Sequence, residues 1–451
     1  MKRVNVFALG SVLSVVLGSA AAAAAGNSGN TNSTSGTETE GQEVVGIESV
    51  VVTAQRREEL ARNVPFSITT ADAVQLEKAG VTNMMDLQKV VPGLVMTGDG
   101  AWSMPSLRGV STTVSGPTND SPIAVYVDGI YQPNQLGGFF DLPNIERVEV
   151  DKGPQGTLFG RNATGGAIQI ITAAPSFTPS WSVEATAGVF PGAGSSHVAS
   201  DLGVKGFLTG PLTDDLAGSI SVHLNNTSGY LNDIVRHDSY GQMRDFGGRA
   251  KLQYNVSDDL SFVLTGFYND RDDDHAGSAV ALDGISVATL WPGSIVTSEP
   301  WEITADQRPY VKTKTWGISL RGDLDSDIGT FTSLTSYYDV RVDADINTDL
   351  AYASLDFWQM GPGVDFKLPN YYERSFSQEV YLSSHKWGPF SFVSGANMYL
   401  STGFQPGVIN DFRQAAPLPA LLGTGPIFQF SALIHATAYA AYTELYYDAT
   451  N

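Results

Sequence analysis

The stretch Glu146–Thr172 reads ERVEVDKGPQGTLFGRNATGGAIQIIT and divides the chain into two parts of different character. It opens with a charged, β-branched run, Glu146–Val150, which predicts a strand, and it closes with a second β-rich run, Ala167–Thr172. The glycines between the runs predict tight turns where a side chain would be strained: Gly153, Gly156, Gly160, Gly165 and Gly166. Residues before this stretch predict a compact mixed domain behind a flexible leader, and residues after it predict long alternating strands.

Composition limits the classes of function. The 451 residues carry 26 Lys and Arg against 47 Asp and Glu, a net charge of −21. This balance argues against a nucleic-acid partner, because phosphate binding needs a basic stripe. The chain has no cysteine, which excludes disulfides, thiolate metal sites and a cysteine nucleophile.

The N-terminus predicts a targeting signal. Lys2 and Arg3 form a short positive region, Phe7–Leu17 a mostly apolar core, and Gly18–Ala25 a run of small residues. This pattern is typical of a secretory signal peptide, residues 1–25, cleaved near Ala23–Ala25. A membrane-anchoring helix is the alternative, but it needs about 20 apolar residues. No later stretch is apolar enough for a spanning helix, so a mature protein in a membrane would cross it as a β-barrel.

Residues 26–46 are rich in small polar residues and predict a flexible leader. They lead into Ile47–Ala54, which has very high β propensity and is closed by the polar run Gln55–Glu59. A β-prone run on a flexible tether could add itself to the edge of a partner's sheet. The alternative is an ordinary first strand of the next domain.

Residues 60–174 predict a small α+β domain with enough chain for its own core. Thr70 and Thr82 are placed to cap two short helices. Ser106–Val110 and Ala124–Val127 predict strands, and Asp128–Gly129 is a strong hairpin signal.

Residues 180–451 predict long strands with a period of two. In Thr330–Ile346 one face carries apolar side chains, and the other carries mostly polar ones. The same alternation recurs in Leu216–Leu224, Ala250–Val256, Leu260–Tyr268, Trp316–Leu324 and Phe390–Leu400. Several runs reach the roughly 9–11 residues that a strand needs to cross a bilayer, beyond the roughly 5–6 of ordinary soluble strands.

The connections between these runs alternate in length. Short links at Gly210–Asp214, Ser257–Asp259, Ser326–Gly329 and Lys386–Pro389 alternate with much longer ones, which is typical of an outer-membrane barrel. About ten strands are expected. The last run, His435–Tyr447, is followed by residues that resemble another short turn, and an open edge in lipid is costly. We therefore expect an incomplete barrel and a C-terminally truncated chain.

Four motifs in this order resemble the TonB-dependent outer-membrane receptors, in which a plug domain sits inside a transmembrane antiparallel β-barrel of 22 strands. The resemblance covers the whole chain and is most specific in these places: Glu48–Arg57; Val91–Leu94 with Leu107–Val110; Val125–Tyr131; and Glu146–Val150 with Gly153–Asn162. The resemblance implies an outer-membrane location in a Gram-negative-type bacterium, export by the cleaved signal, and no enzymatic activity.

The resemblance also implies energy-coupled uptake of a scarce, large solute, most often a ferric siderophore, and in other members cobalamin, haem, sugars or nickel complexes. Residues 47–58 resemble the TonB box region, and the strand that TonB would pair with comprises Val50, Val51, Val52, Thr53 and Ala54. TonB transmits force from a proton-driven inner-membrane complex. No cofactor is implied.

Contacts between plug and barrel are predicted for Arg108, Lys152, Arg161 and Glu379. The family commonly has an arginine where Lys152 stands, and lysine lacks the bidentate fork that suits a carboxylate. Arg108 is therefore the better candidate to pair with a barrel carboxylate such as Glu379.

Other site patterns are weaker. Trp291, Trp301, Tyr310 and Trp358 lie in predicted external loops, where they could stack on a ligand or belong to the interfacial girdle of aromatic residues. The acidic run Asp270–His275 lacks regular metal-ligand spacing, so a solvated loop is favoured over a metal site. The Gly160–Gly166 loop lacks the ending of a phosphate-binding loop.

Three rival functions are disfavoured. A passive porin would not need a plug-like domain with a tethered β-prone run. A barrel enzyme would need a catalytic motif, and neither G-x-S-x-G nor H-E-x-x-H occurs. A signalling receptor would need a folded domain before the TonB box region, for which the leader is too short and too polar. The identity of the solute is not readable from the loops.

Overall fold

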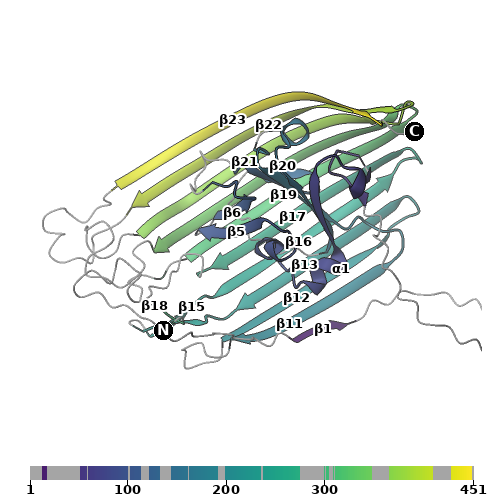
Figure 1. Cartoon of the computed structure of the whole chain (residues 1–451). Coiled ribbons are helices and arrows are strands. Elements are labelled where there is room, and N and C mark those ends of the chain that lie inside the picture. The colour runs from purple at the N-terminus through teal and green to yellow at the C-terminus, as the bar shows by residue number, and fades with distance from the viewer. Residues whose placement is uncertain are drawn as a thin grey trace, which may run out of the picture.

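A computed structural model describes residues 13–17, 51–57, 59–99, 102–112, 121–132, 144–160, 162–190, 199–234, 237–274, 299, 301–303, 308, 310–347, 365–409 and 428–448. Within them, two bodies of structure lie against each other (Figure 1): a long antiparallel sheet and a smaller domain packed on one face of it. Among these residues, no helix is long and apolar enough to cross a membrane.

Ten strands follow the smaller domain and form the long sheet, each antiparallel to the next. This confirms the expectation of about ten strands. Most of them are long enough to cross a bilayer at a tilt. They are β11 Ser180–Phe190, β12 Ala199–Pro211, β13 Leu216–Thr227, β16 Met243–Asn255, β17 Leu260–Asp273, β19 Tyr310–Ser326, β20 Gly329–Asn347, β21 Asp365–Ser384, β22 Phe390–Ile409 and β23 Phe428–Tyr447.

Strand ends that are joined by short connections lie at one end of the long sheet, and strand ends that are separated by longer stretches of sequence lie at the other, as the sequence predicts. The short ones are residues 212–215, 256–259, 327–328 and 385–389. On the free edge of β11 lies β1, Leu13–Leu17, which pairs antiparallel with it. These five residues fall within the predicted signal peptide, whose cleavage stays a prediction.

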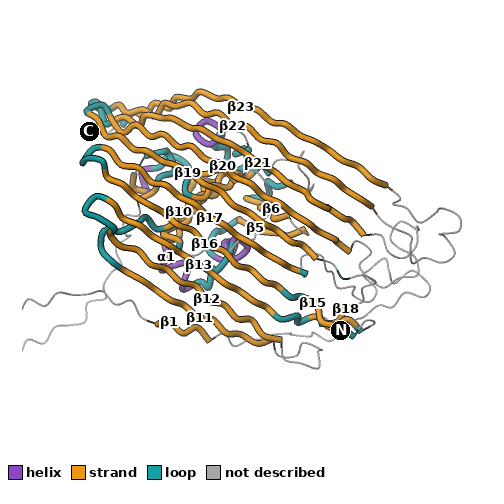
Figure 2. Tube along the Cα trace, turned by 180° about the vertical axis from the view of Figure 1, so that it is seen from behind, coloured by secondary structure: helices purple, strands orange, loops and turns teal. Residues whose placement is uncertain are grey.

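The two faces of the long sheet differ in chemistry. Figure 2 shows the sheet from behind, with the view of Figure 1 turned by 180°. On the face away from the smaller domain, apolar side chains such as Ile220, Leu264 and Leu320 are exposed. On the face toward it, polar side chains such as Ser221, Lys251 and Thr265 are buried. On β13, β16, β17 and β19 the period-two alternation therefore separates an apolar outer surface from a polar inner one.

The smaller domain, here called the plug domain, is built on a five-stranded sheet of order β4-β9-β10-β7-β8. Residues 146–172 supply two of its three inner strands, β9 and β10, which are antiparallel to each other, and β10 pairs parallel with β7 on its other side. The bounds are β4 Ser67–Asp72, β9 Ile145–Lys152, β10 Gly166–Thr172, β7 Ile123–Val127 and β8 Ile130–Gln132. Asp128 and Gly129 have φ of +50° and +79° and close the β7–β8 hairpin, as predicted.

The remaining elements are short. Two strands, β5 and β6, form a hairpin; two more, β2 and β3, pair with each other at the start of the plug domain; and three form a small sheet, of order β15-β14-β18. They are α1 Ala73–Lys78, α2 Gly156–Phe159, η1 Ala61–Asn63, η2 Met84–Lys89, β2 Val51–Val52, β3 Glu59–Leu60, β5 Leu94–Asp99, β6 Trp102–Leu107, β14 Leu231–Asp233, β15 Asp238–Tyr240 and β18 Glu302–Ile303.

Both predicted helix caps were misplaced. Asp72, not Thr70, caps α1 through a reciprocal capping box with Gln75. Asn83, not Thr82, caps the second helix, which is a 3-10 helix. The predicted strand Ser106–Val110 is also shifted, since β6 ends at Leu107.

Alternation along β9 gives the plug sheet two buried faces. Val148 and Val150 join the apolar core beneath α1, η2 and the β5–β6 hairpin. Glu149 and Asp151 point to the other face and are fully buried there. Because buried carboxylates require partners, this polar face directs attention to what covers it.

Candidate functional site

The segment 51–57 covers the polar face of the plug sheet and carries most of the predicted TonB box. Val52 and Ala54 are 0% exposed and pack with Val64 in a small apolar cluster. The backbone N–H of Thr53 donates to both carboxylate oxygens of Glu149, at 3.0 and 3.1 Å, and Arg147 donates to the same carboxylate at 2.7 Å. Val50 lies outside the described residues. The β-prone segment is therefore held against the plug domain by backbone and side-chain contacts.

Arg56 fastens the same segment to the long sheet. Its guanidinium lies 3.0 Å from the carboxylate of Glu379 on β21, and the two side chains are 9% and 11% exposed. Glu379 also accepts a hydrogen bond of 3.0 Å from the hydroxyl of Tyr442. Burial would lower the pKa of Arg56, but the carboxylate of Glu379 and the nearby tyrosine hydroxyls together outweigh burial and raise that pKa above its ordinary value. The pair is thus a buried, charge-assisted contact between the segment and β21.

Arg57 makes a second contact with the long sheet. It donates to the hydroxyl of Ser391 at 2.8 Å, and its guanidinium lies 3.9 Å from the centre of the Tyr446 ring. Its other amino group pairs with Glu59 at 3.1 Å. Neither Arg56 nor Arg57 was predicted as a contact. A signal was present, because two adjacent arginines closely follow the β-prone run Ile47–Ala54 and need partners when they are buried with it.

The turn of the β7–β8 hairpin makes a further ionic contact with the long sheet. Here the plug domain supplies the carboxylate and the long sheet supplies the cations, the reverse of the Arg56–Glu379 pair. The carboxylate of Asp128 lies 3.2 Å from the ammonium of Lys251 and 3.8 Å from Nε of Arg249, both on β16. Thr172 donates to Asp128 through its backbone N–H at 2.9 Å, and its carbonyl accepts from Lys251 at 3.0 Å. Burial would raise the pKa of Asp128, but the two cations and Thr172 outweigh it and lower that pKa below its ordinary value.

The predicted plug–barrel contacts are partly rearranged. Glu379 pairs with Arg56 instead of Arg108, which donates to Ser67 within the plug domain at 2.8 Å. Lys152 donates to the carbonyl of Pro92 at 2.8 Å, also within the plug domain, because even-numbered residues of β9 face the domain's own core. Arg161 lies outside the described residues.

The predicted ligand-binding aromatics are only partly described. Trp291 and Trp358 lie outside the described residues. Trp301 packs on the cluster formed by β14, β15 and β18, with its ring edge-on to Tyr230 at 6.2 Å. The hydroxyl of Tyr310 donates to Asp343 at 3.2 Å. The placement of Trp301 favours a structural role within the loop sheet, and ligand binding by these residues stays a prediction.

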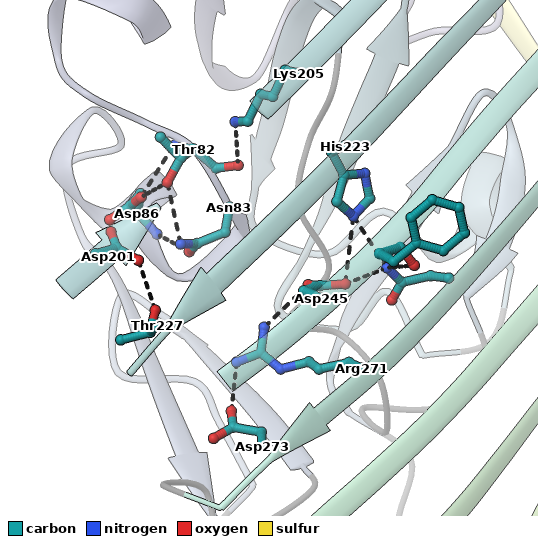
Figure 3. Close-up of polar contacts among 12 residues, drawn as sticks. Thr82, Asn83, Asp86, Asp201, Lys205, His223, Thr227, Asp245, Arg271 and Asp273 are labelled. Atoms are coloured by element: carbon teal, nitrogen blue, oxygen red, sulfur yellow. Dashed lines mark hydrogen bonds and ion pairs between the residues drawn. The ribbon is translucent and has the colours of Figure 1, made fainter. Parts of the chain in front are cut away.

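A polar network lies on the inner face of β13, β16 and β17 (Figure 3). Asp245 is 0% exposed, accepts from Asn269 at 2.6 Å, and lies 3.4 Å from Nε2 of His223. Arg271 pairs with Asp245 and with Asp273, at 3.5 and 2.6 Å. Among the described residues, no group of three or more His, Cys, Asp or Glu side chains could hold a metal ion. All the charged partners in this network lie on the long sheet itself.

The burial of Asp151 predicts a pH-dependent plug stability. Burial and the neighbouring Glu149 raise the pKa of the Asp151 carboxyl well above its ordinary value of 3.8. The folded state then holds a proton that the unfolded chain releases, so plug stability falls as pH rises above about 4 toward the raised pKa. We expect Asp151→Asn to slow hydrogen exchange in peptides spanning residues 145–152 at pH 7 and to weaken its pH dependence. Equal exchange in both proteins, after correction for intrinsic rates, would contradict this account.

Comparison with known proteins agrees with this architecture. Residues 61–167 match the family model described as the TonB-dependent Receptor Plug Domain. The chain is 34% identical over 217 residues to the pesticin receptor of Yersinia pestis, covering 47% of this chain and 30% of that receptor. It is 31% identical over 229 residues to an iron-regulated outer membrane virulence protein of Vibrio cholerae, covering 48% and 33% of the two chains. Over 136 residues it is 36% identical to a vitamin B12 transporter of Vibrio vulnificus, covering 29% and 22%.

Solved structures extend the likeness to the long sheet. The ferric yersiniabactin uptake receptor of Yersinia pestis superposes with a TM-score of 0.69 at 22% identity, covering 85% of this chain and 54% of that one. The ferripyoverdine receptor of Pseudomonas aeruginosa superposes with a TM-score of 0.67 at 16% identity, covering 89% and 52%. The fold is that of a plug domain against part of a β-barrel, and the chain spans about half the length of these structures.

Proposed function

Because the chain belongs to the TonB-dependent receptor family, we propose that the whole protein imports a scarce, large solute across the outer membrane with energy supplied through TonB. The family consists of transport proteins, and the chain is not an enzyme. The exposed apolar outer face of the long sheet, with side chains such as Ile220 and Leu320, supports a location in lipid.

The observation that carries the proposal is the segment 51–57. It combines high β propensity with attachment to both bodies of the structure, through Glu149 of the plug domain and Glu379 of β21. Pulling this segment would act on both attachments at once. TonB is the proposed partner and would pair with the segment as an added strand. Val52 and Ala54 are buried, so release must precede pairing.

A ferric siderophore complex is the proposed solute. The pesticin receptor and the iron-regulated protein of Vibrio cholerae are similar over nearly half of this chain, and the second carries iron regulation in its name. A carbohydrate, haem or cobalamin-like ligand is the alternative for the same architecture. The similarity to a vitamin B12 transporter supports that alternative.

Substituting Val51 tests the energy-coupled function. Its side chain is exposed, and it lies in β2 opposite Leu60. Val51→Pro removes a backbone N–H that an added strand would use, whereas the control Val51→Thr keeps both the N–H and a β-branched side chain. In cells supplied with a panel of radiolabelled iron chelates and with cobalamin, we expect the proline variant to bind its solute normally and to import it at least about tenfold more slowly, because strand pairing is lost.

The outcome separates the coupled transporter from a passive channel. A passive channel would import solute equally through the proline and threonine variants. Equal import, with equal amounts of receptor in the membrane, would therefore overturn the proposal.

A further inference from the structure

Two cations on the inner face of β16 are neutralised differently from their neighbours. Arg249 and Lys251 have side chains only 12% and 7% exposed, and their described ion-pair partner is Asp128 of the plug domain. By contrast, Arg321 pairs with Asp323 on its own strand, and Arg271 pairs with Asp245 and Asp273 within the long sheet. The charge balance of Arg249 and Lys251 therefore depends on where the plug hairpin lies.

Asp128 fits this cation pair incompletely. Its carboxylate is 3.8 Å from Nε of Arg249, too far for a hydrogen bond, and that buried Nε has no hydrogen-bond partner among the described residues. Both carboxylate oxygens of Asp128 are already engaged by the hydroxyl of Thr172. A guanidinium can bind a carboxylate through two parallel hydrogen bonds, and Asp128 does not use that capacity.

A carboxylate that is not part of the chain could accept the hydrogen bond from Nε of Arg249 that Asp128 does not accept. It could approach Arg249 side-on and reach Lys251, which lies two residues along the same face of β16. Every such contact would compete with Asp128, because two buried cations favour the anion with the better geometry. Binding of the anion would free the β7–β8 hairpin from the long sheet.

We propose that Arg249 and Lys251 form a binding site for a carboxylate of the transported solute, which replaces Asp128 and thereby releases the plug hairpin. This inference rests on the proposed transport function and deepens it, because it assigns the solute to the carboxylate-bearing class. Arg249 is the middle residue of β16 and Lys251 lies two residues nearer its short-turn end, so the site would serve a solute that has already passed the end of the sheet with the long connections. The anion shifts the plug toward its released state because it binds that state more tightly.

Hydrogen exchange with a small polycarboxylate tests the proposal. The probe is tricarballylate, added to the purified receptor in detergent at ionic strength matched with KCl, so that general screening is equal. We expect millimolar tricarballylate to speed hydrogen exchange in peptides spanning residues 123–132 by about tenfold, because the hairpin opens locally when the contact of Asp128 with Arg249 and Lys251 is replaced. Peptides of η2, which lies elsewhere in the plug domain, serve as the internal control.

Variants distinguish an anion-binding site at Arg249 and Lys251 from a purely structural ion pair between these residues and Asp128. Asp128→Asn should exchange quickly with or without the probe and should bind tricarballylate at least about tenfold more tightly in calorimetry, because its competitor is gone. Adding Lys251→Met to that variant should abolish the gain, whereas adding Lys251→Arg should keep it. If the Met variant does not assemble, Arg249→Gln in the same background replaces it.

Two results would overturn the inference. In one, hydrogen exchange of residues 123–132 in the unaltered receptor does not change as tricarballylate is added, up to the concentration that saturates binding in calorimetry. The other is equal affinity of Asp128→Asn with and without the Lys251→Met change. Neither result involves TonB, so failure here is distinguishable from failure of the energy-coupled function, which the Val51→Pro experiment tests.

Discussion

Replacing Gly166 with alanine is expected to unfold the plug domain while leaving the long sheet assembled. Gly166 begins β10, where it pairs with Lys152 on β9 and with Ile123 on β7. A Cβ there would clash with the carbonyl oxygen of Asp151, and the residue has a φ of +153°. Backbone crowding and an unfavourable φ act together at the centre of the sheet, so we expect a loss of more than about 3 kcal/mol.

The measurement is limited proteolysis combined with hydrogen exchange of peptides from residues 144–172. Gly156→Ala is the matched control, because its added Cβ meets nothing within 4 Å and a first helical turn accepts alanine. Peptides of β20 should stay protected in both variants. Protection of β9 and β10 in Gly166→Ala equal to that in Gly156→Ala would show that the backbone adjusts and that the glycine is dispensable.

The long strands could be predicted because alternation with a period of two persists over them. The run Thr330–Ile346 matches β20, Gly329–Asn347, almost to the residue. Which face points inward was not predictable from that strand. Its apolar side chains, Leu334 and Val340 among them, are buried on the side of the plug domain, whereas on β19 the outward face is the apolar one. Where the plug domain covers the inner face of the long sheet, the apolar side chains of a strand can point to either face. Alternation along the sequence therefore predicts a strand but not which of its faces points inward.

The helix caps failed for a tertiary reason. Thr70 has the side chain of a cap, but it lies in β4 and pairs with Glu149, so its backbone is committed to the sheet. The helix therefore starts later, after Asp72, which forms the capping box. Thr82 instead donates its hydroxyl to Asp86 at 3.0 Å. Strand pairing across about 80 residues of sequence overrides a local capping preference.

The partner of Glu379 could not be found from the sequence either. A buried barrel carboxylate demands a cation, and Arg56, Arg108 and Arg147 all meet that demand by type. Only the three-dimensional path of the segment after β2 brings Arg56 to β21. Arg56 adopts φ of +58°, in a turn closed by its N–H to the carbonyl of Thr53, which no residue preference in the sequence indicates.

Replacing Arg56 with alanine is expected to release the segment 51–57 from its buried position. The change leaves the Glu379 carboxylate buried with the Tyr442 hydroxyl as its described hydrogen-bond donor. Removing one partner of a buried ion pair costs about 3–5 kcal/mol, and contacts of Arg56 with the Phe159 ring at 5.1 Å are lost as well. At about 1.4 kcal/mol per factor of ten, the released population should rise by at least about a hundredfold.

A single thiol can report that release, because the chain contains no cysteine. Val52→Cys provides it in β2, where the native side chain is 0% exposed, so its rate of maleimide labelling measures how often the segment leaves the plug domain. We expect fast labelling with Arg56→Ala, slow labelling with the charge-keeping Arg56→Lys, and no further gain when Glu379→Gln is added to Arg56→Ala, because the pair is then already broken. If release limits TonB pairing, the alanine variant should also bind TonB more tightly without solute. Labelling rates that are the same in the alanine and lysine variants would show that Glu149 alone holds the segment through Thr53.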